Sequence, residues 1–172
     1  MKKLRITLGI QLIFFSGWGV YLLSSRNANT PEFYLETTPV DPRDLISGTY
    51  VALSYAISEP QAGKCASMLP WYRAFHVKLE SRGKTAATAQ GPVPLYEAAD
   101  CSSEARYDAG WAKATVEPGP AGTRAAKYGI ERFYLNENDP RKDARSGAVL
   151  AKVKIDNRRQ LVLLDLVAKV QP

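Results

Sequence analysis

The sequence predicts a mostly β domain, either an antiparallel sandwich or a partly open barrel, of about seven strands and one short helix. An N-terminal transmembrane helix is expected to precede it. Three observations predict this: an uncharged apolar run near the N-terminus, a series of short strand-like segments after it, and turn residues between those segments. No long helical patterns alternate with the strands, as a parallel α/β sheet would require.

The apolar run covers residues 6–23, ITLGIQLIFFSGWGVYLL, and carries no charge. As a helix with a rise of about 1.5 Å per residue it would be roughly 27 Å long, close to the hydrocarbon thickness of a bilayer. Trp18 and Tyr21 lie near its far end, where aromatic side chains suit the membrane–water interface. The run therefore predicts a membrane-spanning anchor.

Three basic residues, Lys2, Lys3 and Arg5, precede or open the apolar run. By the positive-inside rule they predict a cytoplasmic N-terminus and export of everything after Ser25. A cleaved signal peptide is the alternative. It is disfavoured because a cut after Ser25 would place Leu23, rather than a small residue, at the third-last position of the removed piece.

These features divide the chain into a cytoplasmic stub and anchor at residues 1–25, a tether at 26–31 and an exported β-rich domain at 32–172. The prediction is a single-pass protein of the cell inner membrane whose main domain is periplasmic or extracytoplasmic. Of the 23 basic residues three lie in the first segment, so the remainder carries 20 basic and 17 acidic side chains. Because this excess is small, no nucleic-acid partner is expected.

The two cysteines, Cys65 and Cys101, are a disulfide candidate, because an even number outside the cytoplasm favours a bond. Two unpaired buried thiols are the alternative. With one histidine in the chain, two isolated cysteines cannot build the usual four-ligand structural zinc site. No metal or other cofactor is expected.

Composition places strands and turns along the first part of the exported domain. Residues 32–38 are rich in aromatic and β-branched residues, and residues 50–57 and 71–80 alternate between apolar and more polar positions. Residues 40–47 are expected to form a turn. Residues 81–100, with their glycines and prolines, are expected to form a turn and an irregular loop.

The second part of the domain continues the pattern. Asp139, followed by proline, is typical of a helix N-cap, so a short helix is expected at residues 141–145. Two final strands with a tight turn between them predict a hairpin. The strands expected in this part are residues 110–117, 127–135, 148–156 and 160–170.

The segment at residues 39–55 reads PVDPRDLISGTYVALSY. It resembles the family of membrane-anchored bacterial proteins that is named for a Gly-Asp-Tyr-x-x-Leu-x-Tyr motif. Thr49 stands where the motif has Asp, which removes a carboxylate from the pattern. The motif positions that match are Gly48, Tyr50, Leu53 and Tyr55.

A second segment, Tyr128 and Gly129 with the residues that follow them, YGIERFY, is similar to the downstream tyrosine–glycine strand of that family. The resemblance implies single-pass proteins of unknown biochemical function. It further implies an association with polytopic membrane proteins, and it supplies no reaction.

The motif has a physical interpretation of its own. Gly48 can supply a positive φ angle at the start of a strand. Leu53 and Tyr55 share a face and are expected to pack into the core, whereas Tyr50 points the other way and could reach a partner. A core-and-turn motif and a recognition surface are both open.

The predicted function is a non-enzymatic interaction or assembly domain in the cell envelope. His76 lies on the polar side of an expected strand and is interpreted as a solvated residue. One alternative is an envelope hydrolase that uses a carboxylate pair drawn from Asp41, Asp44, Glu131 and Glu137. The other is a binder of anionic lipid or polysaccharide. Its basic residues would be Arg141, Lys142, Arg145, Lys152, Lys154, Arg158 and Arg159.

Overall fold

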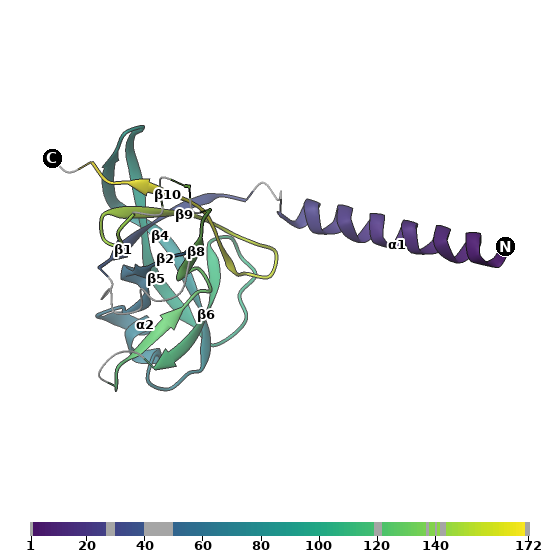
Figure 1. Cartoon of the computed structure of the whole chain (residues 1–172). Helices are drawn as coiled ribbons and strands as arrows, with labels where there is room; N and C mark the ends of the chain where they lie inside the picture. Colours follow the sequence, from purple (N-terminus) through teal and green to yellow (C-terminus); the bar gives the residue numbers. More distant parts are fainter. Residues whose placement is uncertain are drawn as a thin grey trace. The chain divides into compact units, whose positions relative to one another are not determined.

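The computed structural model describes residues 2–26, 30–39, 50–118, 122–136, 138–139, 141 and 144–170, with side chains except at 2–5 and 22–26. The chain divides into two compact units, Met1–Thr30 and Pro31–Pro172. The first contains one long helix, and the second contains all of the strands found in the described residues (Figure 1).

The helix of the first unit, α1, covers Lys2–Arg26. Its large apolar side chains point in all directions around the axis, and each is more than half exposed. The ring of Phe14 packs edge-on against those of Phe15 and Trp18, with centroids 5.6 Å apart. Among the residues that the structure describes, no helix is long and apolar enough to cross a membrane. The exposed apolar side chains of α1 are Ile6, Leu8, Ile10, Leu12, Ile13, Phe14, Phe15, Trp18, Val20 and Tyr21.

The second unit is mostly β, as predicted. Within the described residues, seven strands form one curled, half-barrel sheet in the order β10-β9-β1-β5-β4-β6-β7 (Figure 1). β3 pairs with β1, and β2 and β8 form a separate two-stranded sheet. The strands are β1 (Glu32–Thr38), β2 (Tyr50–Ala52), β3 (Ser54–Tyr55), β4 (Ala74–Thr88), β5 (Gly91–Ser102), β6 (Trp111–Pro118), β7 (Arg124–Lys127), β8 (Arg132–Tyr134), β9 (Val149–Ile155) and β10 (Leu161–Ala168).

One strand pair departs from the predicted antiparallel arrangement. β1 and β5 are parallel, with Tyr34 opposite Leu95 and Leu35 opposite Tyr96. The pairing covers only these two positions, whereas β1 pairs antiparallel with β9 over five. β1 therefore lies between a strand from the middle of the sequence and one from its end.

Two backbone contacts hold the large sheet in its curled form. At one end Thr88, near the tip of the β4–β5 hairpin, forms a bridge with Lys169, and Val170 N donates to the carbonyl of Ala87 at 2.9 Å. Elsewhere Lys113 N on β6 donates to the carbonyl of Arg159, in the β9–β10 turn, at 2.6 Å. These bonds join strands that are not neighbours in the sheet.

The core forms on one face of the large sheet, because alternate residues of each strand point to the same side. On β4, Phe75, Val77 and Leu79 are buried, so the alternation predicted for residues 71–80 is confirmed over residues 75–80, whereas Trp71 is exposed. The burial alternation predicted for residues 50–57 is also confirmed. That segment is nevertheless two short strands, β2 and β3, and a 3-10 helix at Ala56–Ser58.

The prediction of an irregular loop at residues 81–100 was wrong. β4 and β5 form a long hairpin there, with residues 89–90 in its turn. Gly83 has a φ of 85° where the register shifts between Ser81 and Thr85, so it marks a bulge. Prolines at residues 92 and 94 are tolerated because strand positions two apart direct their backbone nitrogens to the same side, away from the partner strand.

Two other expected elements differ from the structure. Residues 127–135 are not one strand: β7 ends at Lys127 and β8 begins at Arg132, because the chain turns at Gly129, which has a φ of 80°. Trp71, Tyr72 and Arg73 precede β4 instead of belonging to it.

The helix predicted at residues 141–145 is described only in part, and Arg141 has the conformation of a 3-10 helix. Ala144 N donates to the carbonyl of Arg141 at 3.0 Å, which is a single turn, while Pro140, Lys142 and Asp143 lie outside the described residues. A short α-helix that was not predicted, α2, covers Gly63–Met68. The final hairpin of β9 and β10 is confirmed.

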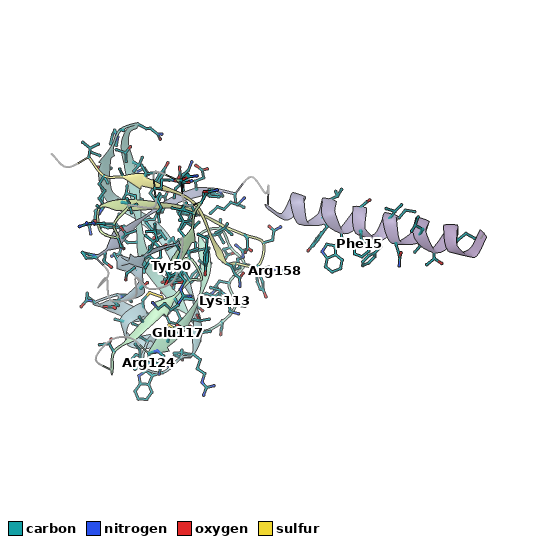
Figure 2. The ribbon with its side chains drawn as sticks, viewed as in Figure 1. Phe15, Tyr50, Lys113, Glu117, Arg124 and Arg158 are labelled. Carbon is teal, nitrogen blue, oxygen red and sulfur yellow. A yellow bond between two sulfur atoms is a disulfide. The ribbon has the colours of Figure 1, made fainter. Side chains whose placement is uncertain are left out.

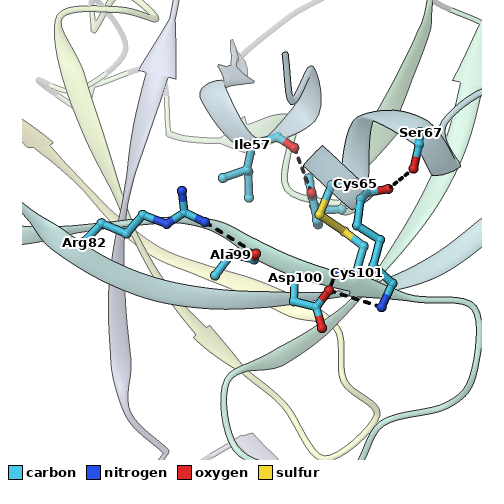
Figure 3. Close-up of a disulfide and its surroundings, with 9 residues drawn as sticks. Ile57, Cys65, Ser67, Arg82, Ala99, Asp100 and Cys101 are labelled. Atoms are coloured by element: carbon cyan, nitrogen blue, oxygen red, sulfur yellow. Dashed lines mark hydrogen bonds and ion pairs between the residues drawn. A yellow bond between two sulfur atoms is a disulfide. The ribbon is translucent and has the colours of Figure 1, made fainter. Parts of the chain in front are cut away.

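The predicted disulfide is confirmed: Cys65 on α2 is bonded to Cys101 on β5, with their Cα atoms 5.1 Å apart (Figure 3). Both residues are buried. Beside the bond, the Asp100 carboxylate accepts from Cys101 N at 2.8 Å and lies 3.2 Å from the Lys64 ammonium. The backbone hydrogen bond, followed by Lys64, lowers the pKa of Asp100. The disulfide attaches α2 to the sheet.

Candidate functional site

The two segments of the tyrosine motif, far apart in the sequence, lie side by side in the structure. β2 pairs antiparallel with β8, with Tyr50 opposite Tyr134 and Val51 opposite Phe133. Just beyond the paired residues, Leu53 N donates to the carbonyl of Glu131 at 2.8 Å. The motif is therefore a meeting point of two chain segments.

Two buried tyrosines join these segments reciprocally. Tyr55 donates its hydroxyl hydrogen to the carbonyl of Ile130 at 2.6 Å, and Tyr128 donates to the carbonyl of Ile57 at 3.0 Å. Each hydroxyl thus binds a backbone carbonyl two residues from the other tyrosine. We call Tyr55, Ile57, Tyr128 and Ile130 the tyrosine clasp. Because the carbonyls are buried, each bond satisfies an acceptor that water cannot reach.

Glu131 contacts the clasp at Tyr128. Its carboxylate accepts from Tyr128 N at 2.6 Å. Burial, and after it the negative charge of Glu131, raise the pKa of Tyr55 and of Tyr128 far above its ordinary value. Both phenols therefore stay protonated as hydrogen-bond donors at neutral pH, and neither is suited to acid–base chemistry near pH 7.

The opposite face of the β2–β8 ribbon points outward. The rings of Tyr50 and Tyr134 have centroids 5.7 Å apart, and the guanidinium of Arg132 lies 5.3 Å from the centroid of the Tyr50 ring. Tyr134 is 68% exposed. We call these three residues the aromatic face (Figure 2 labels Tyr50). Large, rigid side chains of this kind, with arginine, are enriched where proteins bind one another.

Several predicted site residues cannot be placed. Gly48 and Thr49 of the motif, and the carboxylates of Asp41, Asp44 and Glu137, lie outside the described residues. Glu131 is described, and its carboxylate is bound to the backbone of the clasp. The carboxylate pair of a hydrolase therefore stays a prediction. In the described part of the chain, no group of three or more His, Cys, Asp or Glu is arranged to hold a metal ion.

His76 is half-buried instead of solvated as predicted. It pairs in register with Lys113 on β6 and with Ser102 on β5. Its Nδ1 is buried and has no hydrogen-bond partner among the described residues. Burial, then the positive charges of Lys113 and Arg159, lower its pKa, so the ring is neutral at pH 7.

Two of the basic residues predicted to bind anionic lipid or polysaccharide are paired with carboxylates, while Lys142 lies outside the described residues. Arg141 is held by the carboxylates of Asp139 at 2.6 Å and Asp165 at 2.5 Å, and its guanidinium lies 5.4 Å from the centroid of the Phe133 ring. Lys152 is 2.8 Å from the Glu32 carboxylate. Arg141 and Lys152 are therefore engaged within the domain.

The described surface includes two hollows that sequence reasoning did not indicate. The larger, about 540 Å³, is lined by Glu36, Thr37, Thr38, Pro39, Ala56, Arg145, Ser146, Gly147, Ala148 and Lys169. The smaller, about 200 Å³, lies between the end of β7 and the β9–β10 turn, and we call it the notch. Its lining residues are Lys113, Thr115, Lys127, Tyr128, Gly129, Gln160 and Leu161.

The curled sheet, the disulfide and the clasp define a small, mostly β domain whose tyrosine motif is built into its packing. The family model described as "GDYXXLXY protein" matches residues 12–166, so the chain belongs to the GDYXXLXY family. Neither the comparison with curated proteins nor that with solved structures found a match.

The family resemblance identified the motif residues from the sequence, but the residues that accept their hydrogen bonds were missed. Ile57 and Ile130 take part through backbone carbonyls, for which a side chain gives no signal. The exposed Trp71, 83% accessible, was placed inside a strand because the alternation continued through it. The aromatic face could be anticipated only for Tyr50.

Proposed function

We propose that this chain is a single-pass, membrane-anchored interaction domain without catalytic activity. In this proposal α1 lies in the cell inner membrane and the β domain lies on the periplasmic or extracytoplasmic side. The aromatic face binds a second membrane protein, one with several spans. This partner class follows the resemblance to the family.

The observation that carries the proposal is that the inner and outer residues of the motif have different roles. The hydroxyls of Tyr55 and Tyr128 donate hydrogen bonds within the domain, and the Glu131 carboxylate accepts from the backbone nitrogen of Tyr128. The same ribbon fixes Tyr50 and Tyr134 on its outer side. The polar groups of this motif form internal hydrogen bonds that make the ribbon rigid, and its aromatic rings face outward. Such an arrangement suits the binding of a partner better than catalysis.

The anchor is supported by α1 and by the sequence around it. Its apolar side chains surround the helix axis, which is typical of a helix in lipid or in a core. Described side chains of α1 cover residues 6–21, and the uncharged apolar run of the sequence continues to Leu23. Basic residues before the run support a cytoplasmic N-terminus. A disulfide supports an oxidising compartment for the domain.

A topology test addresses the anchor. A reporter that matures only outside the cytoplasm, fused after Pro172 of the full chain, should be active, and the protein should stay in the membrane after carbonate washing. An inactive reporter, or a protein released by the wash, would overturn the anchoring proposal.

A crosslinking test addresses the partner. In membranes that hold the full chain, crosslinking should join it to a polytopic membrane protein, and Tyr50→Ala with Tyr134→Ala should remove that product. Tyr72→Ala, which truncates an exposed aromatic residue outside the ribbon, is the matched control and should retain it. Recovery of self-crosslinked protein alone would contradict the interaction proposal, as would a product indifferent to the double variant.

A further inference from the structure

One end of the β domain is tied to the end of α1 by the length of the chain between them. From Arg26, the last residue of α1, to Glu32, the first of β1, six residue steps can span at most about 20 Å. Glu32 is paired with Lys154 on β9, two residues before the β9–β10 turn at Asp156. The turn therefore lies at the tethered end of the domain.

Basic and aromatic side chains gather at this end, and we call Tyr107, Lys113, Arg158 and Arg159 the tether-end surface. Tyr107 is 76% exposed, and the Arg159 guanidinium lies 6.0 Å from its ring centroid. Arg159 donates to the carbonyl of Asp108 at 2.9 Å, which joins the turn to the loop that carries Tyr107. Figure 2 labels Arg158 and Lys113 in this part of the domain.

Three acidic residues lie near the surface, and one of them is engaged with the backbone. The Asp156 carboxylate accepts from the backbone nitrogens of Arg158 and Gln160 at 2.9 and 2.8 Å. The other two are Asp108 and Glu104. Lys113, Arg158 and Arg159 carry the basic charge of this surface, and the Arg159 guanidinium is bound to the Asp108 backbone carbonyl instead of to a carboxylate.

The notch adds a hollow beside Arg159. Lys113 and Lys127 both line its volume of about 200 Å³, and neither ammonium group has a carboxylate partner among the described residues. Gln160 and Thr115 add polar groups to its wall. A phosphate group is small enough for this volume, and two ammonium groups offset its charge.

We propose that the tether-end surface contacts the anionic headgroups of the bilayer that holds α1, with one lipid phosphate seated in the notch. This rests on the proposed anchoring. Tyrosine is enriched at membrane–water interfaces, and arginine or lysine near an anionic surface strengthens the contact about fivefold per residue. The tether keeps the surface close enough for such contacts to form.

The test uses the full chain in vesicles of phosphatidylcholine alone or with phosphatidylglycerol added. Amide hydrogen exchange is followed by mass spectrometry in residues 103–110 and 156–160. Anionic vesicles should slow exchange in both segments relative to neutral vesicles, and added salt should reverse the slowing. Arg158→Gln with Arg159→Gln should weaken the contact about 25-fold and abolish the difference between the two kinds of vesicle.

The matched control is Arg73→Gln with Arg145→Gln, which removes the same charge from exposed positions elsewhere in the domain. It should retain the slowing. Equal exchange in both vesicles, or slowing that survives in R158Q/R159Q, would overturn the proposal. So would equal slowing by inorganic phosphate without vesicles, because the site would then be one for a free anion.

Co-flotation of the same samples separates this proposal from the anchor. If the full chain floats with neutral vesicles but exchange is insensitive to phosphatidylglycerol, the anchor stands and the lipid contact fails. If it floats with neither kind of vesicle, the anchoring proposal fails, and the lipid contact that rests on it fails as well.

Discussion

The two sides of the β2–β8 ribbon put the same kind of residue to opposite uses. On the inner side the phenols of Tyr55 and Tyr128 are buried, and each donates one hydrogen bond to a backbone carbonyl of the other segment. On the outer side Tyr50 and Tyr134 contact each other through their rings, and Tyr134 is mostly exposed. A motif rich in tyrosine is therefore not one functional unit: its inner half sets the stability of the domain, and its outer half is available for binding.

The largest expected effect separates the two sides directly. Tyr55→Ala removes a fully buried ring and its hydrogen bond, and should lower the free energy of unfolding by about 4 kcal/mol. Tyr134→Ala, on the outer side, should change it by less than about 1 kcal/mol. Urea unfolding of the full chain measures both. Equal losses from the two variants would show that the ribbon has no inner and outer division.

Removal of the disulfide tests whether the bond next to the clasp contributes to the stability of the domain. The Ile57 carbonyl that receives the Tyr128 hydroxyl lies beside the Cys65–Cys101 bond (Figure 3). Removing the bond with Cys65→Ala and Cys101→Ala should cost about 3 kcal/mol in urea unfolding. Reduction of the wild-type protein should give a similar loss, and no effect of reductant on the double variant is the control. An unchanged free energy of unfolding without the bond would contradict the structural role of the disulfide.

A smaller effect sharpens the energetic role of the hydroxyl groups. Tyr128→Phe keeps the ring but leaves the buried Ile57 carbonyl without its donor, which should cost about 1–3 kcal/mol. Tyr50→Phe, which removes a hydroxyl from the outer side, should cost less than about 0.5 kcal/mol. The difference, measured by thermal unfolding, should vanish if water satisfies the carbonyl.

The smallest expected effect is confined to acid pH and lies outside the ribbon. Hydrogen bonds from Arg141 lower the pKa of Asp139 to about 2, below its ordinary value of 3.8. The folded state therefore binds this proton less readily, so the stabilisation is present above pH 3.8 and is lost as the pH falls towards 2. Asp139→Asn should flatten the acid limb of the stability–pH curve, whereas Asn138→Ala should leave it unchanged.

Local pattern predicted the strands whose packing is simple. Phe33 and Leu35 on β1, and Phe75, Val77 and Leu79 on β4, alternate with more exposed residues in sequence and are buried in the structure. The disulfide followed from compartment and cysteine number. In these strands the burial of one face follows directly from the alternation in the sequence.

The errors arose where contacts between distant residues overrode local signals. Gly83 and the prolines of β5 resemble loop residues, but a bulge and a one-sided pairing accommodate them within the hairpin. The segment after Lys127 is apolar enough for a strand, yet Gly129 turns it so that Tyr128 reaches Ile57. The aromatic face needs β2 and β8 to be paired, and no local pattern specifies that pairing.

The position of β1 in the large sheet has a consequence for how the domain is made. The strand emerges first, yet its longest pairing is with β9, which is translated more than a hundred residues later. Until then one edge of β1 is left open, and the sheet cannot close on itself. A chain that stops before residue 149 therefore lacks the partner of β1's longest pairing, so the large sheet can be completed only after the final hairpin has been made.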